Sequence, residues 1–282
     1  MEEEIKRERN SEFSKKAYSL LSWANKGENI TVRDDQYDFV WVLDSAKLCR
    51  KRGFRFRLID TGKFCCSELE WLAEAGADLY TSDEARSDTL ELELLNKACR
   101  RGRAFMAYFH YGPIERRESE GESNSVSFSE LMNLGANGIY LHLTNRKNKR
   151  DFSHLNQLAF ACRKGGSWLV YYHHGPLEAP LKEFARNGAW IHITDKSIKE
   201  SEDVSLLFEI IKSARLAGTR LVLYLEKGLD FALLREILGA GAFVLFNFSL
   251  FDYKSPFRNL EKEAKRKKLN FRAFYLYTHF LP

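Results

Sequence analysis

The feature that most constrains the fold of this chain is an internal repeat. One block ends a helix with Gly-Ala or a similar small pair and then enters a short strand, at 71–86, 131–146, 184–197 and 237–249, with a degenerate copy at 23–35. A second block is a strand preceded by basic residues and Gly, and usually followed by another Gly, at 54–62, 104–113, 168–176, 221–228 and 273–282. This alternation indicates five tandem units, each with two strands.

Helical segments separate these blocks and carry apolar residues at three- and four-residue spacing, as in 88–102 and 203–218. Alternating strands and helices predict parallel pairing with right-handed crossovers, in either an open doubly wound sheet or a barrel. Because repetition favours closure, we expect an α/β fold of the parallel (βα) TIM-like barrel type. Ten predicted strands exceed the usual eight. Either two strands lie outside an eight-stranded barrel, or the barrel is larger and a helix at 11–26 covers its seam.

The chain is expected to form one domain over 1–282, because 282 residues that are 44% apolar can bury a substantial core. A Ser- and Glu-rich insertion at 114–130 is expected to be a surface loop or a lid. The apolar stretches are too short to span a membrane. The N-terminus lacks the apolar core of a secretory signal, so we expect a cytoplasmic protein.

The five cysteines, with Cys65 and Cys66 adjacent, make a poor disulfide framework, and reduced thiols are expected. The net charge of +5 is mild, and the basic runs fall at predicted helix C-termini, where cations complement the helix dipole. No nucleic-acid partner is therefore expected, although an interaction protein that uses these basic helix ends is an alternative. The expected partner is a small polar molecule, and the sequence gives no oligomeric state.

Each strand of the second block divides into two sets of side chains, because successive residues face opposite sides. One set ends every copy in a titratable residue: Asp60, His110, His173, Glu226 and His279. In four copies a tyrosine stands two positions earlier: Tyr108, Tyr171, Tyr224 and Tyr277. The polar face of the first-block strands carries His142 and His192. The opposite sets are largely apolar and suit a helix layer, so the polar sets are predicted to share the barrel interior.

This polar ring would lie at the C-terminal strand ends, where parallel α/β folds bind their ligands. We predict catalytic roles for Asp60, Glu226, His110 and His173. Substrate binding is predicted for Tyr108, Tyr171, Tyr224, Tyr277, His142 and His192. Five of these positions could hold a divalent metal ion: Asp60, His110, His173, Glu226 and His279. Such a metal would serve a hydrolase or isomerase that acts on a small polar substrate.

Two alternatives use the same residues. Asp60 and Glu226 could form the carboxylate pair of a metal-independent, glycosidase-like enzyme. The ring could instead complete its own hydrogen bonds in a non-catalytic ligand-binding or scaffolding barrel. No nucleotide-binding glycine loop and no nucleophile elbow is present to decide between these functions.

Several neighbouring polar residues are assigned other roles. Asp83, Asn145 and Asp195 end first-block strands and are predicted to cap the next helix. Arg86, Arg146 and Lys196 are predicted to be solvated loop charges, with contact to an anionic substrate as the alternative. Tyr111, His174 and Lys227 follow the ring positions, so they are predicted to point away from the ring.

Overall fold

The computed structural model describes residues 18–114, 126–226, 228–247 and 256–274. These residues form two units. Unit 1 comprises 18–109 together with Val126, and unit 2 comprises 110–114 and the described residues from 127 onward.

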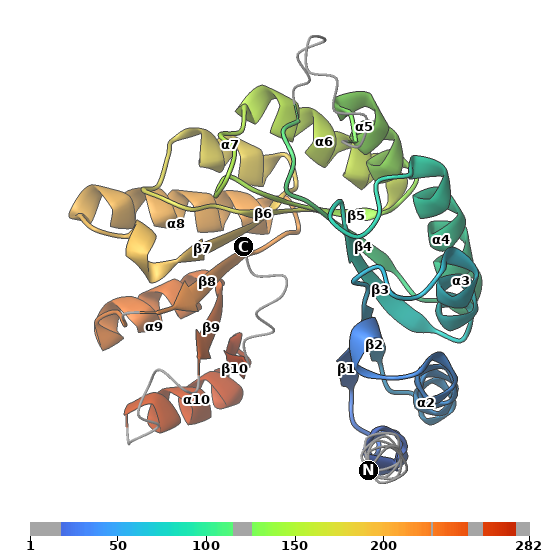
Figure 1. The fold of residues 1–282 in the computed structure, drawn as a ribbon. Helices are drawn as coiled ribbons and strands as arrows, with labels where there is room; N and C mark the ends of the chain where they lie inside the picture. The colour runs from blue at the N-terminus through green and yellow to red at the C-terminus, as the bar shows by residue number, and fades with distance from the viewer. Residues whose placement is uncertain (1–17, 115–125, 227, 248–255, 275–282) are drawn as a thin grey trace, which may run out of the picture. The chain divides into compact units, whose positions relative to one another are not determined.

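Unit 1 alternates strands and helices after an N-terminal helix over 18–26 (Figure 1). Its further elements are β1 (Ile30–Arg33), η1 (Asp34–Gln36), α2 (Phe39–Arg52), β2 (Phe56–Ile59), α3 (Cys66–Glu74), β3 (Ala77–Ser82), α4 (Thr89–Gly102) and β4 (Met106–His110), whose last residue belongs to unit 2. Strands β1 to β4 pair in parallel in the order of the chain.

Unit 2 continues the same alternation. Its elements are α5 (Phe128–Ala136), β5 (Tyr140–Thr144), α6 (Phe152–Gly165), β6 (Leu169–Tyr172), α7 (Pro180–Arg186), β7 (Trp190–Thr194), η2 (Asp195–Ser197), α8 (Ser201–Leu216), β8 (Leu221–Leu225), α9 (Phe231–Ala240), β9 (Phe243–Asn247), α10 (Pro256–Lys267) and β10 (Phe271–Phe274). Strands β5 to β10 also pair in parallel with their neighbours in sequence. The predicted α/β class and parallel pairing are therefore confirmed, and the described residues contain the ten strands expected, the last of them at Phe271–Phe274.

Local sequence explains where the helices begin and end. The side chain of Asp88 accepts a hydrogen bond from Leu90 N at the start of α4, and Asp151 does the same for Ser153 N at the start of α6. Basic residues occupy the last turns of α2, α4 and α6, as predicted, where they face the negative ends of the helix dipoles.

The predicted insertion at 114–130 ends earlier than the sequence suggested. Ser127 and Glu130 form a capping box, and α5 begins at Phe128, so the last residues of the insertion are helical. Residues 115–125 lie outside the described part of the chain. The five cysteines are all free thiols, in agreement with the prediction. Within the described ranges, none of the helices combines the length and the apolar character that a membrane crossing requires.

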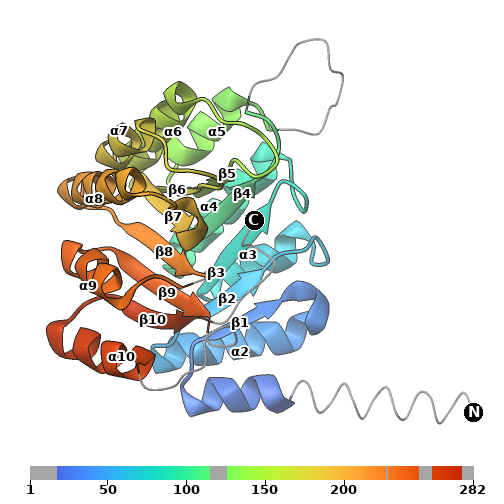
Figure 2. The ribbon, with the colours of Figure 1, turned by 90° about the vertical axis from the view of Figure 1, so that its left-hand side faces the viewer.

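The helices of unit 2 cover one face of its strands. Figures 1 and 2 show α6 to α9 in succession on one side of β6 to β9. The strand residues that face this layer are apolar and fully buried, including Leu141, Leu143, Ile191, Ile193 and Leu223. We call this side the helix face of unit 2.

Candidate functional site

Two adjacent tyrosines identify the two faces of β6. Tyr171 lies on the helix face, where its ring centroid is 6.3 Å from that of Phe152 on α6 and 5.5 Å from that of Phe184 on α7. Tyr172 points the other way, and its ring centroid is 4.6 Å from that of His192. Strand register agrees, because Tyr171 is paired with the buried Ile191 and Tyr172 with His192.

The side chains opposite the helices form what we call the open face of unit 2. Strand register places residues from six strands on it: Tyr140, His142, Thr144, Val170, Tyr172, Trp190, His192, Thr194, Val222, Tyr224, Phe243, Leu245 and Arg272. Several of these side chains are only half-buried, among them His142, His192 and Tyr224. The open face is therefore rich in aromatic and imidazole rings, and part of it can contact a ligand.

Two histidine–tyrosine pairs dominate this face. Nδ1 of His142 lies 3.0 Å from the hydroxyl of Tyr172, and Nδ1 of His192 lies 2.9 Å from the hydroxyl of Tyr224. Burial lowers the pKa of both histidines to about 3, and it raises the pKa of Tyr224. At neutral pH the pairs consist of neutral imidazoles and protonated phenols, which bind hydroxyl or carbonyl groups well but carry no charge.

Charged groups lie at the C-terminal ends of these strands. Glu226 follows β8 and forms an ion pair with the exposed Lys196. The charges of Arg146 and Glu226 both act on His174, which lies two residues beyond Tyr172. Burial lowers the pKa of His174, with Arg146 acting in the same direction and Glu226 opposing it. The sequence excluded His174 because it should point away from the ring residue His173; since His173 lies on the helix face, that exclusion does not remove His174 from the open side.

Asn145 and Asp195 hold the loops that carry His174 and Glu226. The amide of Asn145 accepts a hydrogen bond from His174 N at 2.7 Å and donates one to His174 O at 2.9 Å. The carboxylate of Asp195 accepts from Glu226 N at 3.0 Å and from Gly228 N at 2.7 Å. Both residues therefore bind the loop after the next strand. The prediction that they cap the following helices is wrong.

The predicted ring of matched residues does not share one face. Tyr171 and His173 lie on the helix face, and Nε2 of the buried His173 is 2.7 Å from the carbonyl oxygen of Pro176. Nε2 of the buried His110 is 3.4 Å from the carbonyl oxygen of Pro113. Tyr224 is on the open face, as are His142 and His192, whereas Tyr277 and His279 lie outside the described residues.

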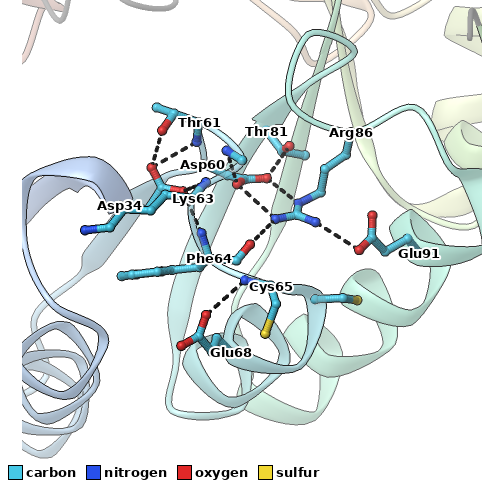
Figure 3. Close-up of polar contacts among 12 residues, drawn as sticks. Asp34, Asp60, Thr61, Lys63, Phe64, Cys65, Glu68, Thr81, Arg86 and Glu91 are labelled. Carbon is cyan, nitrogen blue, oxygen red and sulfur yellow. Dashed lines mark hydrogen bonds and ion pairs between the residues drawn. The ribbon is translucent and has the colours of Figure 1, made fainter.

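Asp60 is likewise on the helix side, in unit 1, where it belongs to a buried network (Figure 3). Its Oδ2 accepts from Thr81 Oγ1 at 2.7 Å and from Arg86 Nε at 2.6 Å, while its Oδ1 accepts from Gly62 N at 3.0 Å. Arg86 also contacts Glu91, with 2.9 Å between Nη1 and Oε1. Arg86 is therefore a buried structural cation, and the prediction of a solvated loop charge is wrong.

Tyr108 and Asp34 complete this network. Tyr108 is fully buried, pairs with Thr81 across the strands and donates its hydroxyl proton to Arg86 O at 3.3 Å. Asp34, at the end of β1, accepts from the backbone nitrogens of Thr61, Lys63 and Phe64 at 3.0, 2.9 and 3.3 Å (Figure 3). These hydrogen bonds hold the loop that follows β2. Asp34 was not identified from the sequence, although its position directly after a predicted strand could have indicated a residue that binds a neighbouring loop.

Two of the predicted metal ligands, His173 and Asp60, are already engaged in hydrogen bonds. A carbonyl oxygen only accepts hydrogen bonds, so Nε2 of His173 carries the proton that bonds Pro176 O, and that nitrogen is not available to a cation. Both carboxylate oxygens of Asp60 are engaged by donors. In the part of the chain that the structure describes, no three His, Cys, Asp or Glu side chains are arranged to hold a metal.

A cavity of about 750 Å³ lies among the loops of unit 2, apart from the residues of the open face. It is lined by Pro113, Ile114, Asn148, Lys149, Arg150, Asp151, Phe152, His154, Glu178 and Pro180. The buried Arg150 donates to the carbonyl oxygens of Gly112 at 2.7 Å and Thr144 at 2.8 Å. Its guanidinium therefore braces the loops, and the remaining lining charges are of both signs.

Comparison with known proteins gives no family. No family model matches the sequence, and no curated protein matches it. Among solved structures, deoxyribose phosphate aldolase from Aeropyrum pernix is 12% identical, with 83% of this chain and 88% of that chain covered and a TM-score of 0.32. A phospho-2-dehydro-3-deoxyheptonate aldolase from Thermotoga maritima is 11% identical, with 87% and 72% covered and a TM-score of 0.35. The HpcH/HpaI aldolase from Desulfitobacterium hafniense is 11% identical, with 88% and 95% covered and a TM-score of 0.32. Scores of this size establish neither a shared fold nor a shared activity.

Proposed function

We propose that the protein is an enzyme that binds a small polar substrate on the open face of unit 2. The observation that carries this proposal is the pair of half-buried His–Tyr couples, His142 with Tyr172 and His192 with Tyr224. A strand face that only packs against other protein is normally filled by Val, Ile and Leu, as most of the helix face is here apart from Tyr171 and His173. Imidazoles and phenols in those positions favour hydrogen bonding to a ligand.

The reaction would occur at the C-terminal ends of the strands, next to Glu226. Its carboxylate is half-buried and is paired with Lys196, and the imidazole of His174 lies within range of its charge. A carboxylate beside an imidazole can take a proton from a substrate and return it. This chemistry suits an isomerase, or a hydrolase in which the carboxylate activates water. It needs neither Asp60 as a partner carboxylate nor the metal set predicted from the sequence.

The two adjacent tyrosines give a matched test of this proposal. Ligand-observed NMR would screen wild-type protein against a panel of sugars, sugar phosphates, hydroxy acids and nucleosides. Tyr172→Phe removes the phenol that contacts His142 and should weaken binding of any hit. Tyr171→Phe removes a phenol on the helix face and should leave binding unchanged. Equal effects of the two variants, or no hits at all, would refute a substrate site on the open face.

A non-catalytic ligand-binding protein is the second candidate, and one observation favours it. The histidines of the open face have a pKa of about 3, so they are weak bases at neutral pH. The two functions differ in what happens to a bound compound over time. An enzyme converts it to product and loses turnover, but not binding, in Glu226→Gln. A binding protein leaves it unchanged in both the wild type and the variant.

A further inference from the structure

Two buried nitrogen atoms near the two ends of the open face have no hydrogen-bond partner among the residues that the structure describes. One is Nε1 of Trp190, at the start of β7, and the other is Nε2 of His174, beyond the end of β6. A buried polar atom without a partner is uncommon and requires an explanation, of which a missing ligand is one. Trp190 can only donate, so whatever completes its bonding must offer an acceptor oxygen or nitrogen.

The distance along the strands sets the length of such a ligand. Trp190 and Thr194 are four residues apart in β7, a rise of about 13 Å at about 3.3 Å per residue. His173 N donates to His192 O at 2.8 Å, so the next residue, His174, lies level with the C-terminal half of β7. A ligand that reaches both nitrogens must be longer than a single sugar ring.

The rings between these two positions set the chemistry of the ligand. The centroids of Tyr172 and His192 are 4.6 Å apart, those of His142 and Tyr172 are 5.9 Å apart, and those of His192 and Tyr224 are 5.6 Å apart. These rings form a platform whose polar atoms belong to neutral groups, and among the described residues Nε2 of His192 has no hydrogen bond. The C–H faces of sugar rings pack on such platforms, and their hydroxyls both donate and accept.

We propose that the substrate is an uncharged carbohydrate of two linked rings that lies along the open face, with its hydroxyls completing the hydrogen bonds of Trp190 Nε1 and His174 Nε2. This inference rests on the proposed function and adds the class of substrate to it. An uncharged ligand fits because the described side chains between Trp190 and His174 are neutral, whereas the guanidinium of Arg272 lies over the ring of Phe243, on the side of β9 and β10. The charged groups at the strand ends include an ion pair of their own, Lys196 with Glu226.

The test uses maltose, cellobiose and lactose as probes, with glucose, glucose 6-phosphate and adenosine as comparisons. Isothermal titration should show binding of at least one disaccharide to the full chain. Trp190→Phe keeps the ring and removes the N–H, so affinity for that disaccharide should fall about three- to tenfold. Trp71→Phe, which alters an exposed indole on α3, is the matched control and should have no effect.

A second measurement follows binding in the wild-type protein and uses the variant only to assign one signal. In the wild-type ¹H–¹⁵N spectrum, the indole N–H signal of Trp190, assigned by its loss in Trp190→Phe, should shift when the disaccharide is added. An unchanged signal would overturn the inference, as would equal affinity of Trp190→Phe. If only glucose 6-phosphate or adenosine binds, and Tyr172→Phe weakens it, the carbohydrate class is wrong and the substrate site stands. If no probe binds, both proposals fail.

Discussion

Arg86 and Asp60 form a buried ion pair in unit 1, with 2.6 Å between the guanidinium Nε and the carboxylate Oδ2. Their side chains are 6% and 0% exposed, so neither charge is compensated by water. The sequence placed one of these residues in a catalytic site and the other in a solvated loop, but they are partners in a structural network.

Removing one member of this pair should strongly destabilise the protein. Asp60→Ala leaves the Arg86 guanidinium buried without its main counter-charge, and we expect the free energy of unfolding to fall by about 3–5 kcal/mol. Urea denaturation measures this change. Glu74→Ala is the control, because it breaks an ion pair with Arg101 in which both side chains are about half exposed, and it should cost about 1 kcal/mol or less. A similar decrease in the free energy of unfolding for the two variants would contradict a structural role for the Asp60–Arg86 pair.

Acid should destabilise the protein through His142 and His192. Burial lowers the pKa of both imidazoles to about 3 in the folded state, whereas unfolded histidine titrates near 6.5. Between these values the unfolded chain binds protons that the native state does not, so the free energy of unfolding falls as the pH falls from about 6.5 to about 3. Each histidine contributes at most about 1.4 kcal/mol per pH unit.

Urea titrations at several pH values test this dependence. Because carboxylates titrate in part of the same range, the comparison is with the double variant His142→Gln/His192→Gln, which should show a shallower dependence. If the free energy of unfolding had the same pH dependence in both proteins, folding would not lower the pKa of these two imidazoles. They would then be protonated in the native state over this pH range.

Two glycines in helices should respond to alanine in opposite ways. A Cβ on the buried Gly102, the last residue of α4, would collide with the carbonyl oxygen of Ala73, which is backbone and cannot move aside. Gly102→Ala should therefore lose about 1–3 kcal/mol of unfolding free energy. Gly239 in α9 has open space around the corresponding position, so Gly239→Ala should gain up to about 1 kcal/mol. Thermal unfolding of the two variants distinguishes these signs.

The cysteines should differ sharply in reactivity. Cys49, Cys99 and Cys162 are buried, and burial raises the pKa of Cys66 to about 11. Cys65 is exposed. A thiol reagent at pH 8 should therefore modify Cys65 rapidly in the native protein, and all five thiols after denaturation. Cys65→Ser should abolish the rapid phase, and Cys66→Ser should preserve it; the reverse result would contradict this assignment.

Much of the fold could be predicted because it depends on local patterns. Apolar spacing marked the helices, basic residues marked their ends, and the alternation of strand and helix required parallel pairing. The sequence also predicted which face of each first-block strand is buried. In β5 and β7 the residues that alternate with His142 and His192 are Leu and Ile, so only one orientation buries the apolar set.

The candidate site could be predicted only in part, because some second-block strands are ambiguous. In β6 both alternating sets contain a tyrosine followed by a histidine, so hydrophobicity does not distinguish Tyr171 from Tyr172. When the second-block copies are aligned by the glycine that follows each strand, Tyr171 corresponds to Tyr224. However, Tyr171 pairs with Ile191 on the helix face and Tyr224 with Thr194 on the open face. A shift of one residue moves every side chain of a strand to the other face.

The sequence by itself determined the alternation of strand and helix, the parallel order and the chemical types available to a site, because these follow from periodicity and composition. The tertiary structure alone decided which of those side chains meet. Strand register, fixed by packing against α6 and α7, turned Tyr172 and His192 toward each other and directed Tyr171 and His173 to the helix face. That choice depends on contacts between residues distant in sequence, which no local pattern contains.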